Sequence, residues 1–222
     1  VLGQQDRESA MRITIIGLGL IGGSIGMALR RGTTEDLEIV GHDKDHGIAG
    51  KAKRRGAIDK AEWNLPRAVE KAGIVIIATP VQAIGEVFSQ IAPCLEPGTV
   101  VTDTGSTKVQ IMEWARQRLP DSVSFVGGHP MAGKETPGIE SADPNLLTGC
   151  TYCVVPDPRA TPEAIKAIDA MVQLMGAKHV FIDAHEHDGL VAAVSHLPLV
   201  LSCALVTATA TATVAPTIGL LP

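Results

Sequence analysis

The sequence lacks an excess of positive charge, and this absence narrows the kind of partner it can have. Its 222 residues include 19 Lys and Arg against 24 Asp and Glu, for a formal net charge of −5. Binding to nucleic acid or to an anionic membrane surface requires a basic face. The composition therefore argues against both partners, while the length suffices to bury a sizeable core.

Long apolar runs and cysteines are also scarce. No run reaches the length expected of a membrane span and no signal peptide pattern occurs, so the sequence predicts a cytoplasmic enzyme. The four cysteines, Cys94, Cys150, Cys153 and Cys203, are too few and too scattered for a disulfide framework. Cys150 and Cys153 form a C-x-x-C, but the second lies in a strand pattern, where positions three apart face opposite sides. Core packing is the better interpretation of this pair.

The most informative pattern that is present is an apolar run over residues 12–16 that leads into Gly-x-Gly-x-x-Gly. This pattern predicts a dinucleotide site. Gly17 permits a tight turn from strand to helix, Gly19 lets the backbone approach a pyrophosphate, and Gly22 lets the helix pack close to the strand. The N-terminus of the following helix would offer free N–H donors to the phosphates.

The flanking sequence strengthens this interpretation, since a glycine-rich turn alone is weak evidence. A helical pattern follows to about residue 32, and a second strand pattern over residues 37–42 ends in Asp43, 21 positions after Gly22. A carboxylate at this place accepts from the ribose 2′-hydroxyl of NAD and repels the 2′-phosphate of NADP. The sequence thus predicts NAD, although the neighbouring Lys44 could still attract a phosphate.

Strand and helix patterns alternate along the chain with short connections, which predicts a mostly parallel, doubly wound α/β sheet covered on both faces. Residues 1–10 lack periodicity and are predicted to be an extension, and the dinucleotide-binding (Rossmann) domain is predicted to occupy residues 11–182. Further strands are expected over residues 73–80, 99–103, 123–127, 151–155 and 179–182, and further helices over 48–56, 81–91, 162–175 and, after a polar turn over 104–108, up to residue 119.

Residues 183–222 are expected to open an all-helical region that is truncated. Asp183 and Glu186 form a capping-box pattern ahead of an apolar series over residues 190–201. The threonine–alanine alternation from residue 207 is low in complexity and uncharged, so we expect an altered terminus there rather than a packed helical module.

His129 is the leading candidate for acid–base chemistry. In open α/β sheets the ligand lies beyond the carboxyl ends of the strands, and Thr79, Pro80 and the segment 103–108 also follow strands. His129 follows two glycines and precedes proline, so we expect its imidazole to be held on a rigid turn at this edge. A neutral imidazole can take the proton of a hydroxyl as hydride leaves the same carbon.

Four motifs together resemble the prephenate and arogenate dehydrogenase family of tyrosine biosynthesis. They are Gly17-Leu18-Gly19-Leu20-Ile21-Gly22-Gly23-Ser24, Asp103-Thr104-Gly105-Ser106-Thr107-Lys108, Gly127-Gly128-His129-Pro130-Met131-Ala132-Gly133 and Ser195-His196-Leu197-Pro198. The resemblance covers residues 12 to about 205. It implies a nucleotide domain followed by a helical dimerisation domain, and oxidative decarboxylation of prephenate or arogenate with NAD in a homodimer.

The resemblance also implies roles for single residues. His129 would accept the hydrogen bond of the ring hydroxyl, and Ser106 would orient that histidine and the nicotinamide. His196 would face the substrate and Glu135 would lie at the mouth of the pocket. Lys108, Lys134 and His196 are candidate cations for a substrate with two carboxylates, although solvated loop charge explains the two lysines equally well. The predicted cofactor contacts are Gly17, Gly19, Leu20, Ile21, Gly22, Asp43, Thr79, Pro80 and Ser106.

One departure from the family keeps alternatives open. Beyond the Ser-His-Leu-Pro segment the family carries an arginine that clamps the substrate, whereas this chain has no arginine after Arg159. Such a charge-assisted contact contributes about 1.5–3 kcal/mol. The alternatives are an impaired fragment or pseudo-enzyme that only holds NAD, and a β-hydroxyacid dehydrogenase, whose glycine motif is similar but whose chemistry rests on a lysine in the helical domain.

A metal site at His185, His187 and Asp188 is the last candidate. The two histidines are two positions apart at a helix start, so they do not share a face, and Asp183 is better explained as the helix cap. We therefore predict no metal site.

Overall fold

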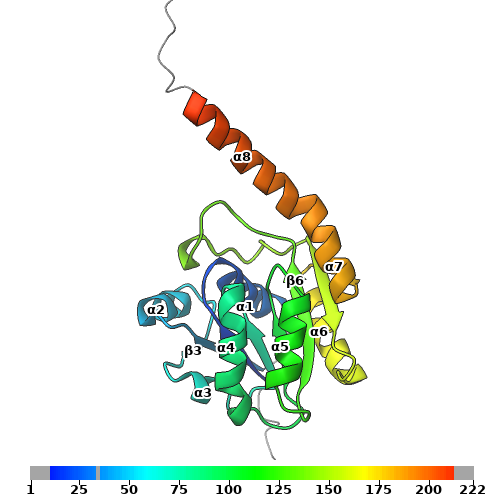
Figure 1. Cartoon of the computed structure of the whole chain (residues 1–222). Helices are drawn as coiled ribbons and strands as arrows, with labels where there is room; N and C mark the ends of the chain where they lie inside the picture. Colours follow the sequence, from blue (N-terminus) through cyan, green and yellow to red (C-terminus); the bar gives the residue numbers. More distant parts are fainter. Residues whose placement is uncertain (1–10, 34–35, 213–222) are drawn as a thin grey trace, which may run out of the picture.

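The structure is a computed structural model that describes residues 11–33 and 36–212, so the extension expected over residues 1–10 lies outside the described residues. It contains one eight-stranded sheet in the order β3-β2-β1-β4-β5-β6-β7-β8 (Figure 1). The strands are β1 Met11–Ile16, β2 Leu37–His42, β3 Lys60–Ala61, β4 Ile74–Ile77, β5 Val100–Asp103, β6 Ser124–Pro130, β7 Thr151–Pro156 and β8 Lys178–Phe181.

Helices cover both faces of the sheet, as predicted. They are α1 Leu20–Gly32, α2 His46–Arg54, α3 Leu65–Ala68, α4 Val81–Ile91, α5 Val109–Arg118, α6 Pro162–Leu174, α7 Ala184–Val191 and α8 Leu197–Ala212. Three short segments are a 3-10 turn over Ala92–Cys94, another over Ile139–Ser141 and a π-helical turn over Ala192–His196. The two-residue strand β3 and the single-turn helix α3 were not predicted, because segments so short carry no readable periodicity.

The central strands are buried on both sides. Along β1, Ile13 and Ile15 pack into a core with residues of α1 and α6, whereas Ile16 packs into a second core with residues of α4 and α5. Successive side chains of a strand point to opposite faces, so a strand between two helical layers needs apolar residues at nearly every position. This explains why β4 consists of four buried apolar residues.

The strand order reverses between β1 and β4, where the nucleotide is expected. All pairings are parallel except that of β6 with β7, which is antiparallel. Because β2 and β4 flank β1, their crossovers depart to opposite sides and leave a crevice beyond the carboxyl ends. The predicted doubly wound, mostly parallel fold is confirmed.

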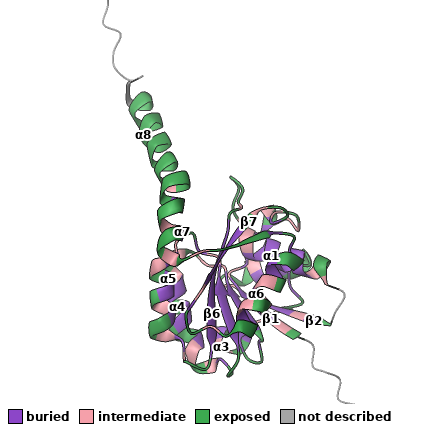
Figure 2. Cartoon of the chain, turned by 90° about the vertical axis from the view of Figure 1, so that its right-hand side faces the viewer, coloured by how far each residue is buried: buried purple, intermediate pink, exposed green. Residues whose placement is uncertain are grey.

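The C-terminal helices leave the domain as one long rod (Figures 1 and 2). Asp183 caps α7 as predicted, accepting from the backbone N–H of His185 and Glu186. Helix α8 runs through the threonine–alanine stretch to Ala212 and is exposed throughout residues 197–210, so helical order continues there without burial against the domain. Alanine is the strongest helix former, and the hydroxyls of Thr207 and Thr209 donate to carbonyls one turn back.

The expectation that no apolar run reaches the length of a membrane span is wrong. Residues Ala184–Ala210 form a helix of 27 residues that is long and apolar enough to cross a membrane. The polar residues between residues 183 and 196 hid this property from a search for continuous apolar runs. One such helix is weak evidence for a membrane protein, because apolar helices from the cores of soluble domains have the same length and composition.

Candidate active site

The glycine turn between β1 and α1 lies at the carboxyl edge of the sheet. Gly17 has a φ of +91°, a conformation that favours glycine, and a Cβ there would lie 2.6 Å from the Ala78 carbonyl oxygen. A Cβ on Gly22 would lie 2.0 Å from the Gly17 carbonyl oxygen, whereas one on Gly19 would meet no protein atom within 4 Å. Gly17 and Gly22 are thus required by the fold, and Gly19 borders open space at the N-terminus of α1.

Two adjoining pockets lie at this edge. One of about 460 Å³ is lined by Gly17, Gly19, Asp43, Thr79 and Pro80 among others. The second, of about 600 Å³, is lined by a set that includes Gly19, Leu20, Ile21, Thr79, Pro80, Ser106 and Lys134. The cofactor residues predicted from sequence are thus brought together, except that Gly22 contributes through packing beneath the turn.

The residues at this edge fit a dinucleotide. The hydroxyl oxygen of Thr79 is buried without a hydrogen-bond partner among the described residues, although Thr79 borders both pockets. A buried polar atom without a partner is costly, so a ligand hydroxyl or amide there would relieve the cost. The open space above Gly19 and the free N–H groups of the first turn of α1 suit a pyrophosphate.

Asp43 lies one residue beyond β2 and lines the first pocket. Its carboxylate accepts from the N–H of Leu18 at 2.8 Å and from the N–H of Asp45 at 2.9 Å. Each carboxylate oxygen has a second lone pair, so Asp43 can hold the glycine turn and still accept from a ribose hydroxyl.

His129 lies inside β6, not on the turn that the sequence predicted. Strand β6 continues through Pro130 because β7 pairs with it on its outer side, placing His129 opposite Cys153. The preceding Gly128 is required by close packing, since a Cβ there would lie 2.5 Å from the Asp103 carbonyl oxygen and 2.6 Å from the Tyr152 hydroxyl. The strand thus holds the imidazole more rigidly than a turn would.

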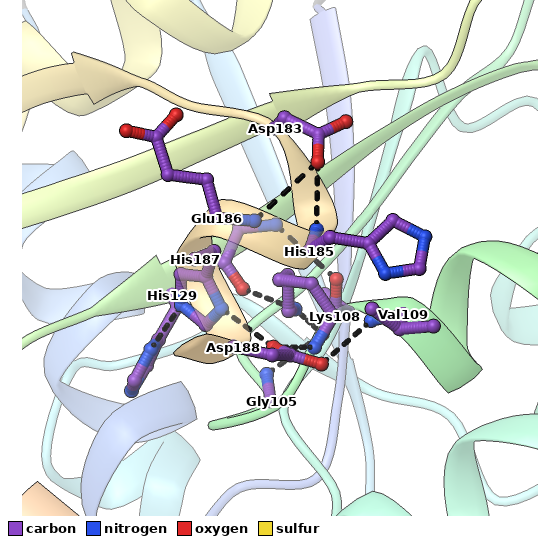
Figure 3. A network of polar contacts seen from close by, with 11 residues as sticks. Gly105, Lys108, Val109, His129, Asp183, His185, Glu186, His187 and Asp188 are labelled. Carbon is purple, nitrogen blue, oxygen red and sulfur yellow. Dashed lines mark hydrogen bonds and ion pairs between the residues drawn. The ribbon is translucent and has the colours of Figure 1, made fainter. Parts of the chain in front are cut away.

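The ring of His129 belongs to a buried polar network (Figure 3). Its Nδ1 lies 2.9 Å from Nε2 of His187, and Nδ1 of His187 lies 2.7 Å from a carboxylate oxygen of Asp188. Asp188 also accepts from the backbone N–H groups of Lys108 and Val109, at 2.7 and 3.0 Å. The network therefore joins β6, α7 and the start of α5.

The surroundings of His129 favour its neutral form. Burial, followed by the positive charge of Lys108, lowers the pKa of His129 from 6.5 to about 4. The neighbouring His187 and His196 act in the same direction, and Asp188 opposes them. At neutral pH the imidazole is therefore uncharged and can accept a proton.

This lowered pKa predicts a loss of stability in mild acid. The unfolded chain takes up a proton near pH 6.5 whereas folded His129 does so only near pH 4, so stability falls as the pH drops through that window. Over this whole pH window, His129 accounts for a loss on the order of 3 kcal/mol in the free energy of unfolding. Urea unfolding at pH 7.0 and 4.5 should show a smaller acid loss for His129→Asn than for the wild type. An exposed control, His185→Asn, should match the wild type, and an equal loss in all three would refute the assignment.

Lys108 is not available to a substrate, contrary to the sequence hypothesis. Its side chain is fully buried, and its ammonium donates to the carboxylate of Asp103 and, at 2.6 Å, to the Gly128 carbonyl. Burial lowers the pKa of Lys108, and the charge of Asp103 opposes that effect. The fold pairs Lys108 with Asp103 across the turn after β5. The bond from Lys108 to the Gly128 carbonyl then holds the backbone beside His129.

Of the other candidate substrate residues, Lys134 lines the second pocket, whereas Glu135 and His196 lie outside its lining. The ammonium of Lys134 donates to the Ser141 carbonyl and the Asp143 carboxylate, both at 3.1 Å. Glu135 is exposed on the same loop. His196 ends the π-helical turn before α8, near enough for its charge to lower the pKa of His129.

The structure also places the residues considered for a metal site and the two cysteines of the C-x-x-C pattern. Across residues 11–33 and 36–212, no group of three His, Cys, Asp or Glu side chains is placed to hold a metal ion. His185 is exposed and His187 is buried, so they do not share a face. Cys153 is buried in β7 and Cys150 packs at the margin of the core just before it.

The sequence did not show that Asp103, His187 and Asp188 are the inner residues of this network, since Asp103 appeared only within a motif and the other two only as candidate metal ligands. His187 and Val191, four positions apart, are the buried residues of α7. That spacing was a readable sign that His187 faces the domain. Its contact with His129, 58 positions away, had no signal in the sequence.

The fold and the glycine turn together define a nucleotide-binding α/β domain with a buried histidine at the carboxyl edge of its sheet. Comparison with known families identifies the one to which this domain belongs. Residues 25–181 match the model of the prephenate dehydrogenase nucleotide-binding domain, and the chain belongs to that family.

Individual relatives agree with this assignment. Prephenate dehydrogenase from Lactococcus lactis is 38% identical over 197 residues, which is 88% of this chain and 53% of that protein. The crystal structure of Synechocystis arogenate dehydrogenase has a TM-score of 0.81 at 34% identity, covering 89% of this chain and 69% of that one. Prephenate dehydrogenase from Aquifex aeolicus, bound to hydroxyphenyl propionate and NAD+, has a TM-score of 0.86 at 28% identity, covering 97% and 74%. The chain spans about half the length of the curated Lactococcus relative.

Proposed function

We propose that this chain is the nucleotide-binding part of an NAD-dependent dehydrogenase of tyrosine biosynthesis. The reaction would be the oxidative decarboxylation of prephenate to 4-hydroxyphenylpyruvate, or of arogenate to tyrosine. The observation that carries the proposal is His129, a buried imidazole that is neutral at physiological pH and lies at the same sheet edge as the glycine turn. The Aquifex relative, which binds NAD+ and hydroxyphenyl propionate, supports it.

The chemistry assigned to this chain is proton removal and charge placement. Bound NAD would supply the acceptor for the hydride that leaves the ring carbon of the substrate. His129 would take the hydroxyl proton as that carbon is oxidised to a ketone, and loss of the ring carboxylate as CO2 would make the ring an aromatic phenolate, to which His129 would return the proton. Aromatisation makes the overall step effectively irreversible.

The cofactor would lie over the glycine turn. Gly17, Gly19 and Gly22 shape the turn, with Leu20 and Ile21 in the first turn of α1. Asp43 would accept from the ribose. On the other side of the crevice, Thr79, Pro80 and Ser106 would border the nicotinamide half, as their place around the second pocket supports.

Fewer cations can reach the substrate than the sequence suggested, because Lys108 is buried against Asp103. We infer that His196 contacts the substrate from the helix that follows α7 and that Ser106 orients the nicotinamide. The hydrogen bond that orients His129 comes instead from His187. Lys134 would approach a carboxylate only by leaving Asp143, and Glu135 would lie at the mouth of the pocket.

A second candidate function is a chain that holds NAD without turning over substrate. The observation that favours it is the placement of the candidate cations: Lys108 is buried against Asp103, and Lys134 is paired with Asp143. A substrate with two carboxylates needs at least one cation that can reach it.

Cofactor reduction measured by absorbance decides between the two. The assay offers NAD with prephenate or arogenate to this chain, and to a version extended with the helical segment of a longer relative. Turnover with one substrate supports the dehydrogenase and names the substrate. NAD binding without turnover in either version would favour the second candidate.

NAD is expected to bind more tightly than NADP because Asp43 repels the 2′-phosphate. Asp43→Ser should narrow this preference, since a hydroxyl still pairs with a ribose but carries no charge. Calorimetric dissociation constants for both cofactors test the prediction, with Asp45→Ser as a control outside the pocket lining. Equal affinities in the wild type would remove Asp43 from this role.

We further infer a domain division and an assembly. Residues 11–182 would form the nucleotide unit, and residues 183–222 would begin a helical unit that pairs two copies of the chain. Support comes from α8, which is exposed over residues 197–210 (Figure 2), and from its apolar side chains, of which Leu205 is 66% accessible. A cytoplasmic location, with neither nucleic acid nor membrane as partner, belongs to the same proposal.

A further inference from the structure

We propose that Asp188 and His187 form a hydrogen-bond relay that holds His129 in the tautomer protonated on Nδ1, leaving the lone pair on Nε2 for the substrate hydroxyl. The assignment rests on the proposed function for its catalytic meaning. The relay itself is a property of this chain and can be tested without turnover.

The direction of the relay starts at Asp188. An ionised carboxylate only accepts hydrogen bonds, so Nδ1 of His187, 2.7 Å away, must be the donor. Asp188 is held in its charged form because, although burial opposes it, the hydrogen bonds from Val109 and His187 lower its pKa. The backbone N–H groups that bind it belong to the N-terminus of α5, where a negative charge is favoured.

The proton on Nδ1 of His187 decides what its other nitrogen can do. A neutral imidazole has one donor and one acceptor, so Nε2 of His187 accepts. The side chain of His187 is fully buried, and contacts at hydrogen-bond distance join it to Asp188 on one side and to His129 on the other. Nε2 of His187 lies 2.9 Å from Nδ1 of His129, which must then be the donor of that bond.

The outcome is fixed at His129. With its proton on Nδ1, the ring presents an unprotonated Nε2, and no hydrogen bond to that nitrogen occurs within residues 11–33 and 36–212. The two rings meet edge to face, with an interplanar angle of 69°. When the hydroxyl proton moves to Nε2, the cation formed on His129 is linked through His187 to the Asp188 carboxylate.

The relay connects two residues of α7 with a histidine in a strand of the nucleotide domain. His187 and Asp188 lie on the helix that leads into His196, whereas His129 lies in β6. In this arrangement His187 and Asp188 are positioning residues. They act on the substrate only through His129.

Nitrogen NMR of the full chain labelled with ¹⁵N-histidine tests the relay. Chemical shifts distinguish the protonated from the unprotonated ring nitrogens at pH 7.5, and coupling across the hydrogen bond would connect Nδ1 of His129 with Nε2 of His187. We expect both rings to be protonated on Nδ1 alone. A His129 ring protonated on Nε2, or a His187 ring protonated on both nitrogens, overturns the proposal.

Three variants separate the relay from simple packing. His187→Leu removes the acceptor, so His129 should shift toward the Nε2-protonated form that free histidine prefers. His187→Gln offers an amide oxygen to the same donor and should retain the Nδ1-protonated form. His185→Leu changes an exposed histidine on the same helix and should leave the His129 signals unchanged. Should His187→Leu unfold the chain, the comparison of wild type with His187→Gln still decides the tautomer.

Kinetics separate failure of the relay from failure of the proposed function. If the extended chain turns over prephenate, His187→Leu should lower kcat at least about tenfold with little change in KM, and His187→Gln should recover part of it. Absence of turnover in the wild type would count against the proposed function alone. An Nδ1-protonated His129 that persists in His187→Leu would count against the relay alone.

Discussion

His129→Asn is expected to lower the rate of hydride transfer about 10²–10⁴-fold, the usual contribution of a general base, while the affinity for NAD stays nearly unchanged. The asparagine cannot take a proton from the substrate hydroxyl, and His129 is absent from the lining of both pockets at the glycine turn. Single-turnover absorbance of the reduced cofactor gives the rate, and calorimetry gives the NAD dissociation constant.

The control is His185→Asn, which changes an exposed histidine of α7 and should keep both quantities at wild-type values. Near-normal turnover in His129→Asn would reduce His129 to a structural residue of β6. A large loss of NAD affinity would instead place the imidazole against the cofactor.

Lys108→Met is expected to lower the free energy of unfolding by about 3–5 kcal/mol, the range for a buried ion pair that loses one partner. The substitution leaves the Asp103 carboxylate buried, with the backbone N–H groups of Gly105 and Gly128 as its remaining donors. Those two bonds cannot replace a full positive charge at a site where both side chains are fully buried.

Urea unfolding followed by circular dichroism measures this loss. Lys53→Met, an exposed lysine of α2, serves as the control and should change stability by less than about 0.5 kcal/mol. A loss below about 1 kcal/mol in Lys108→Met would mean that the pair is dispensable, and that the backbone beside His129 is held mainly by β7.

Much of the nucleotide half could be predicted from local patterns. Strand β1, the glycine turn, helix α1 and Asp43 follow one another within 33 residues, so their relative geometry depends on short-range rules. The predicted helix over residues 81–91 matches α4 at both ends. The structure then places Gly19, Asp43 and Thr79 around the same pocket.

The length of the C-terminal helix could not be read from the sequence. A helix that has already begun continues at little cost through alanine and through threonines whose hydroxyls bond the preceding turn, so α8 extends through the threonine–alanine stretch. The polar first turns of α7 interrupt the apolar pattern, so the 27-residue helix Ala184–Ala210 does not stand out as one apolar run.

By itself, the sequence determined the doubly wound fold, the glycine turn and the identity of His129 as the candidate base, because each depends on periodicity or on residues that are neighbours in the chain. Only the tertiary structure decided what surrounds that base. It placed His129 in a strand through the antiparallel pairing with β7, buried Lys108 against Asp103, and brought His187 and Asp188 to the imidazole. These contacts join residues of different strands and helices, and the energy of a buried charge or hydrogen bond depends on what packs around it rather than on what precedes it in the chain.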